Sequence, residues 1–298
     1  MNKKNHLITS FLSLGLVFLL ISCGSNKEAE KKDKLKDSTT MAGSVKTEEP
    51  KDDDVSYTLP SPAQIAQILK KSGLKYFPDF TNKTEGINYH AASATAKAIN
   101  LGVYSADLSY CVINRQKEES KKYFKVCKDL AADLGLGQAF DMNQMAKRLE
   151  SNLNKEDSLL TLLSEVQMNS DNLLEESDRT FVSVLSFAGA WVESMYIGMQ
   201  VNMKERNISL DHRLVEQMAI GENIIKALNA NKAKDPGIAA IMEDLKALAD
   251  IYNNFGSVKE MKAKDPDVVD ADKLDVSIAE LFTFSRKIEE VRAKFIKA

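Results

Sequence analysis

The chain has little proline and glycine, with 6 prolines and 13 glycines in 298 residues. Because both residues interrupt regular backbone, their scarcity predicts long regular elements. Net charge is also low, at -3. Without the first 22 residues, which hold two lysines and no acid, it becomes -5. A mildly acidic chain lacks the basic surface that nucleic acids require, so we predict no nucleic-acid partner.

Histidine is scarce as well, and this scarcity limits the metal sites that the chain can form. Beyond the first 22 residues only His90 and His212 remain, far apart in the sequence. Five aspartates resemble a calcium loop in spacing, but valine stands at its fifth and twelfth positions and aspartate where glycine is required. We predict helix capping for this run and no metal. The aspartates are Asp265, Asp267, Asp270, Asp272 and Asp275.

Motifs of catalysis are absent too. The sequence contains no nucleophile elbow, phosphate-binding loop or dinucleotide fingerprint. Clustered histidine and carboxylate side chains in an open cavity would be needed to suggest an enzyme. We therefore predict a noncatalytic protein without a cofactor.

The first apolar run ends at the tetrapeptide Leu20-Ile21-Ser22-Cys23. The run covers residues 7–21 and follows two lysines; it is short for a membrane span, which needs about 20 residues, and typical of a signal peptide. Its end resembles the bacterial lipobox. That resemblance implies cleavage before Cys23, a thioether-linked diacylglycerol on its sulfur and acylation (palmitate or a similar chain) of the new amino end. The alternative is an ordinary signal peptide or N-terminal anchor with a chance cysteine.

The predicted organisation has three parts: a signal peptide (1–22), a flexible charged tether (23–57) and a helical domain (58–298). The tether is rich in lysine, acids, serine and threonine, so it cannot bury enough apolar surface to offset its ordering entropy. Gly24 after the lipid cysteine is not an acidic inner-membrane retention signal, which favours the outer membrane. Which face the protein occupies stays open.

Two further cysteines, Cys111 and Cys127, lie in a compartment that permits disulfides. If the helices turn back near Asn114, Cys111 is about three residues before the turn and Cys127 about twelve after it. At 1.5 Å per residue this mismatch exceeds the reach of a bridge unless the turn falls later. Free thiols are the favoured reading, and the disulfide stays an alternative.

Helical periodicity dominates from Ser61 onward, and no stretch shows sustained alternation of β-branched residues. The fold class is therefore all-α: antiparallel helical hairpins in a single bundle-like or short solenoid-like domain of about nine helices. Ser61-Pro62 and Gln64 form a capping box, and Gly73 and Gly135 stop helices. The expected helices cover about 61–73, 91–114, 116–134, 141–153, 157 onward, 178–203, 211–228, 235–251 and 272–295.

Two of these helices are expected at the centre. Segment 91–114 is rich in alanine, glycine and serine, which lets neighbouring helices approach closely, and segment 178–203 is the most apolar. Gly102 and Gly189 each precede an aromatic residue by two positions, so we predict one packing device used twice. By length the second segment is also a candidate membrane span, but Glu193 at its centre argues against a span.

Asp107 and Glu193 are the candidate site residues, because each is an acid within an apolar helix. In one interpretation they face a ligand pocket between the two central helices. In the other, which is favoured, they are buried acids hydrogen-bonded to tyrosine or arginine, since an unpaired buried charge is costly. Four aromatic residues near them in sequence complete the candidate pocket: Tyr104, Tyr110, Trp191 and Tyr196.

Three phrases resemble a family of uncharacterised all-helical lipoproteins of Bacteroidota. They are Tyr57-Thr58-Leu59-Pro60-Ser61-Pro62, Asn100-Leu101-Gly102-Val103-Tyr104-Ser105-Ala106-Asp107-Leu108-Ser109-Tyr110 and Ala188-Gly189-Ala190-Trp191-Val192-Glu193. The resemblance implies an envelope location and no activity. Together with the lipid anchor it predicts a noncatalytic binding or scaffold module at the outer membrane, with an unidentified envelope protein or small molecule as its partner. A small-ligand sensor with its pocket near Asp107 and Glu193 is the alternative.

Overall fold

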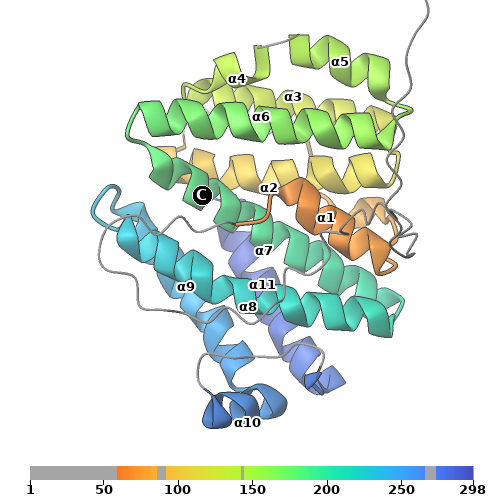
Figure 1. Ribbon diagram of the computed structural model, residues 1–298, viewed down its shortest axis with the longest axis vertical. Helices are drawn as coiled ribbons and strands as arrows, with labels where there is room; N and C mark the ends of the chain where they lie inside the picture. The colour runs from red at the N-terminus through yellow and green to blue at the C-terminus, as the bar shows by residue number, and fades with distance from the viewer. Residues whose placement is uncertain (1–58, 86–91, 142–143, 266–272, 298) are drawn as a thin grey trace, which may run out of the picture. The chain divides into compact units, whose positions relative to one another are not determined.

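The computed structural model describes residues 59–85, 92–141, 144–265 and 273–297 (Figure 1). Within these residues the chain forms eleven α-helices, one short 3-10 helix and no strand, so the all-α prediction is confirmed. The signal peptide, Cys23 and the tether lie outside the described residues. The helices are α1 Pro62–Lys71, α2 Ala94–Ile113, α3 Lys117–Asp133, α4 Gly137–Asp141, α5 Met145–Asn152, α6 Glu156–Glu176, α7 Thr180–Lys204, α8 Ile208–Ala230, α9 Gly237–Asn253, α10 Gly256–Lys264 and α11 Ile278–Phe295, with the 3-10 helix η1 at Pro78–Phe80.

Several predicted helix ends are found. At α1 the Ser61 hydroxyl accepts from the Gln64 backbone N–H, while the Gln64 side chain accepts from the Ser61 N–H. Gly73 and Gly135 follow α1 and α3 with φ of +98° and +76°, a conformation that costs glycine little. Local sequence chemistry therefore fixes these boundaries.

Other boundaries differ from the predictions. The last helix begins at Ile278, with a capping box between Ser277 and Glu280, rather than near residue 272. The N-cap of α8 is Asn207, and Asp211 lies in the first turn instead of opening the helix. The helices α4 and α10 were not predicted, because α4 has only five residues and α10 buries a single residue, Val258, so neither shows an apolar stripe.

Helices α2 and α7 form the centre of the fold, as predicted (Figure 1). A Cβ atom built on Gly102 of α2 would lie 1.7 Å from the Ser186 carbonyl oxygen of α7. A Cβ atom on Gly189 of α7 would lie 2.1 Å from the Ile99 carbonyl oxygen of α2. Each glycine thus admits the backbone of the partner helix, which confirms the predicted packing device.

The remaining helices pack around this pair. Helix α3 packs on α2, α6 on α7, and α8 and α11 also pack on α7, while α9 joins α8 and α11. In a solenoid each repeat contacts only its neighbours, whereas here α11 returns to helices far earlier in the chain. The described domain is therefore a bundle of helical hairpins.

Helix α7 is long and apolar enough to span a membrane, but 72% of its most apolar 18-residue stretch is buried against other helices. Burial of that kind is what a core helix shows. Two of its buried residues, Glu193 and Asn202, are polar and find partners inside the protein.

Candidate functional site

Asp107 of α2 and Glu193 of α7 lie together in the core, and both side chains are fully buried. The amide nitrogen of Asn82 bridges them, donating to Asp107 Oδ2 at 2.8 Å and to Glu193 Oε1 at 3.1 Å. The backbone N–H of Asn82 also donates to Asp107 Oδ2, at 3.2 Å. The structure thus brings the two predicted acids together through a residue from the loop after α1.

Arg292 of α11 supplies the positive charge. Its Nε and Nη2 atoms donate to Glu193 Oε2 and Oε1 at 2.7 and 2.9 Å, a bidentate pair, and Nη2 also donates to Asn82 Oδ1 at 2.9 Å. The guanidinium carbon lies 3.9 Å from the centre of the Tyr196 ring, in cation–π geometry. We name Asn82, Asp107, Glu193, Tyr196 and Arg292 the buried polar cluster.

Tyrosines hold the loop that carries Asn82. Tyr123 donates its hydroxyl to the Asn82 carbonyl at 2.6 Å, and Tyr104 donates to the Lys83 carbonyl at 2.9 Å. Tyr110 donates to the Lys75 carbonyl at 2.6 Å and accepts from the Phe77 N–H at 2.8 Å. Tyr104 and Tyr110, predicted to line a pocket, therefore bind loop backbone.

Trp191 lies apart from the buried polar cluster. Its indole nitrogen donates to the Gln217 carbonyl of α8 at 3.0 Å, and its ring packs against Gly221, where a Cβ atom would lie 3.3 Å away. Trp191, one of the six residues of the candidate pocket, is thus a packing contact between α7 and α8 and not part of the buried polar cluster. The structure shows the favoured interpretation of Asp107 and Glu193, buried acids bonded to arginine, with Asn82 as an additional partner.

Burial raises the pKa of Asp107 well above its ordinary value, and the negative charge of Glu193 acts in the same direction. Burial also raises the pKa of Glu193, against the opposing effect of Arg292. Both oxygens of Glu193 accept from Arg292, whereas Asp107 Oδ1 has no hydrogen-bond partner among the described residues. The raised pKa favours the neutral form of Asp107, in which Glu193 supplies the one negative charge that Arg292 neutralises.

Asn82, Arg292 and Tyr123 are members of this arrangement that sequence reasoning missed. Arg292 had a signal: it lies between Ile288 and Phe295 on the stripe of α11 that faces the core. An arginine at such a position predicts a buried acidic partner. Asn82 had no comparable signal, because its loop shows no periodic pattern.

Cys111 and Cys127 are both free thiols and both buried, so the disulfide alternative is not what the structure shows. Burial raises the pKa of Cys127 to about 12, which leaves it protonated and unreactive at neutral pH. Among the residues that the structure describes, no group of three or more His, Cys, Asp and Glu side chains is placed to hold a metal ion. His90 and part of the aspartate run lie outside those residues.

No protein-family model matches this chain, and neither a curated protein nor a solved structure matches it. What the described residues define is a class of architecture: an all-α bundle whose core encloses an arginine–carboxylate pair beside a second buried carboxyl group with a raised pKa.

Proposed function

We propose that the protein is an envelope lipoprotein: a noncatalytic helical binding or scaffold module anchored to the outer membrane by lipid on Cys23. The observation that carries the proposal is the sequence Leu20-Ile21-Ser22-Cys23 at the end of a 15-residue apolar run, followed by a long charged segment. Since only a thiol can form the thioether, Cys23 is the residue on which the anchor depends. Several acyl chains together make attachment stable, because each buried CH₂ contributes about 0.8 kcal/mol.

The noncatalytic part of the proposal is supported by how the two acids are used. Glu193 has both oxygens bonded to Arg292 and no exposed surface, and Asp107 is equally buried. A general acid or base must come within hydrogen-bond distance of its substrate. Groups so enclosed act on the stability of the fold instead.

In this proposal the charged segment of residues 23–57 is the flexible tether that its composition predicts. About 35 residues of flexible chain have a root-mean-square span of roughly 30–35 Å, and charge repulsion lengthens it. The helical domain would then stand away from the bilayer and meet its partner there.

Metabolic labelling with an alkyne fatty acid tests the anchor. We expect the wild-type protein to be labelled and to stay with membranes after carbonate washing, and Cys23→Ala to lose both properties. Cys111→Ala and Cys127→Ala are matched controls, because each removes a thiol of the helical domain and leaves Cys23 in place. Recovery of an unlabelled protein with residues 1–22 intact from the cytoplasm would overturn the proposal.

A further inference from the structure

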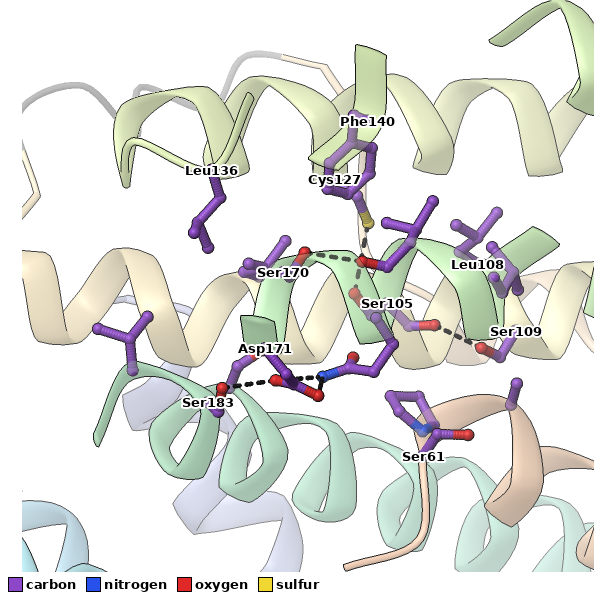
Figure 2. Close-up of a pocket in the computed structure, with 18 of the residues that line it drawn as sticks. Ser61, Ser105, Leu108, Ser109, Cys127, Leu136, Phe140, Ser170, Asp171 and Ser183 are labelled. Atoms are coloured by element: carbon purple, nitrogen blue, oxygen red, sulfur yellow. Dashed lines mark hydrogen bonds between the residues drawn. The ribbon is translucent and has the colours of Figure 1, made fainter. Parts of the chain in front are cut away.

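A cavity of about 50 Å³ lies among α2, α6 and α7, with α3, α4 and the start of α1 contributing to its wall (Figure 2). Its deep wall is apolar and buried, and includes Leu101, Leu108, Phe140, Leu174 and Val182. Serine hydroxyls and one carboxylate lie among these apolar groups. Neither acid of the buried polar cluster lines this cavity, so it is a separate feature of the domain.

The two buried serines that line this cavity donate their hydroxyl protons to backbone carbonyls of their own helices. Ser109 donates its hydroxyl to the Ser105 carbonyl at 2.7 Å, and Ser170 donates to the Val166 carbonyl at 2.9 Å. Both side chains are buried. A hydroxyl has one proton and two lone pairs, so what these oxygens still offer is acceptor capacity.

Asp171 adds a negative charge to the same wall. Ser183 donates to its Oδ1 at 2.6 Å, and Gln167 donates to Oδ1 and Oδ2 at 3.1 and 3.0 Å (Figure 2). All three side chains are half-buried, and these donors are neutral. Within the described part of the chain Asp171 forms no ion pair, and no lysine, arginine or histidine lines the cavity.

We propose that this cavity binds a small protonated primary amine, with the ammonium group on Asp171 and the carbon chain against Leu174 and Val182. An ammonium group brings three donors and a positive charge to a wall that offers acceptors and a negative charge. An anion finds no cation here, and an alcohol brings only one donor. Apolar pockets with a few convergent polar groups are the usual form of a small-molecule site.

The volume sets the size of the ligand. One water needs about 10–15 Å³ of such space, so about 50 Å³ admits a molecule of roughly four non-hydrogen atoms. The n-propylammonium ion and 1-propanol both have that size, and they differ in charge and in donor number. Ligands so small bind with dissociation constants of about 0.1–10 mM at best.

This inference names a ligand class for the binding role proposed above, but it concerns the helical domain alone. It stands whether or not Cys23 carries lipid. The labelling experiment above and the titration described next therefore fail independently of each other.

The test is calorimetric titration of the full-length acylated protein in detergent, in phosphate buffer at pH 7, with n-propylammonium chloride and with 1-propanol. We expect saturable binding of the amine at least about tenfold tighter than binding of the alcohol. Asp171→Asn keeps the shape of the side chain and should abolish the preference for the amine. Asp129→Asn, at an exposed acid of α3, is the matched control and should leave the preference intact.

No saturable heat with either compound would show a cavity that holds only water, and equal affinity of the two compounds for the wild-type protein would show that Asp171 does not select a positive charge. Either result would overturn the proposal. So would an Asp171→Asn protein that keeps the preference. If that variant does not fold, the comparison of amine and alcohol on the wild-type protein decides the question without it.

Discussion

Gly102 and Gly189 lie at reciprocal points of the crossing between α2 and α7, each against the backbone of the other helix. Ser186 and Ile99 provide the carbonyl oxygens that occupy the space of the two absent Cβ atoms. A methyl group at either position would force the two central helices apart. Every other contact between them, including the approach of Asp107 to Glu193, depends on that distance.

The first prediction concerns Gly102→Ala. Because its Cβ atom would lie 1.7 Å from a backbone oxygen, we expect a loss of unfolding free energy of about 3 kcal/mol or more, measured by urea denaturation. Gly256→Ala is the matched control, since its nearest neighbour would be 3.9 Å away, and it should change stability little. Equal stability of the two variants would contradict the close crossing.

The second prediction concerns Arg292→Met. Removing the guanidinium leaves Glu193 buried without its counter-charge, so we expect a loss of about 3–5 kcal/mol in unfolding free energy. The double variant Glu193→Leu with Arg292→Met removes both charges and should recover a large part of that loss. Lys125→Ala, which breaks an exposed pair with Asp129, should leave the melting temperature nearly unchanged. An Arg292→Met protein as stable as the wild type would show that the pair of Arg292 and Glu193 does not stabilise the core.

The third prediction concerns pH. The folded state raises the pKa of Asp107, so its contribution to stability is fully present below the ordinary carboxyl pKa, near pH 4, and is lost as pH rises toward the folded value. Asp107→Asn keeps the shape, accepts from Asn82 and donates toward Glu193 without titrating. We expect its unfolding free energy to fall less than that of the wild type between pH 4 and pH 8. Parallel profiles for the two proteins would sink this account.

The fourth prediction concerns the loop of residues 74–85. Asn82→Ala removes the donor that bridges the two acids and the acceptor for Arg292, at a cost of about 1–3 kcal/mol. We expect faster amide exchange across this loop, followed by mass spectrometry. Tyr123→Phe loses the bond to the Asn82 carbonyl but keeps the Asn82 side chain, and it should show a smaller effect in the same direction. Unchanged exchange in Asn82→Ala would show that the loop is held by other contacts.

Sequence patterns reached far into the fold because much of it is local chemistry. The capping box at Ser61 and the stops at Gly73 and Gly135 each act within a few residues, and each was predicted correctly. The small residues around Gly102 predicted a close approach of another helix, which α7 makes. Segments with a full helical period, such as α7, were also found. The helices α4 and α10 were missed because neither shows an apolar stripe: α4 has five residues, and α10 buries only Val258.

The candidate site was predictable only in part. Asp107 and Glu193 stand out as acids in apolar helices, and sequence reasoning paired them and favoured burial. Their partners could not be named, because Asn82 and Arg292 lie 111 and 99 residues from Glu193. No local rule joins such distant positions; only the assembled bundle does. The cavity beside Asp171 could not be predicted for the same reason, since six segments of the chain contribute to its wall.

The place of Arg292 in the chain has a consequence for biogenesis. A nascent polypeptide that has emerged only as far as α10 already contains both acids but not Arg292, the cation that pairs with Glu193. Because Glu193 buried without its counter-charge would cost about 3–5 kcal/mol, we expect the centre to close only once α11 is present. For the exported lipoprotein proposed above, late closure of the core would keep the chain unfolded during its passage across the membrane.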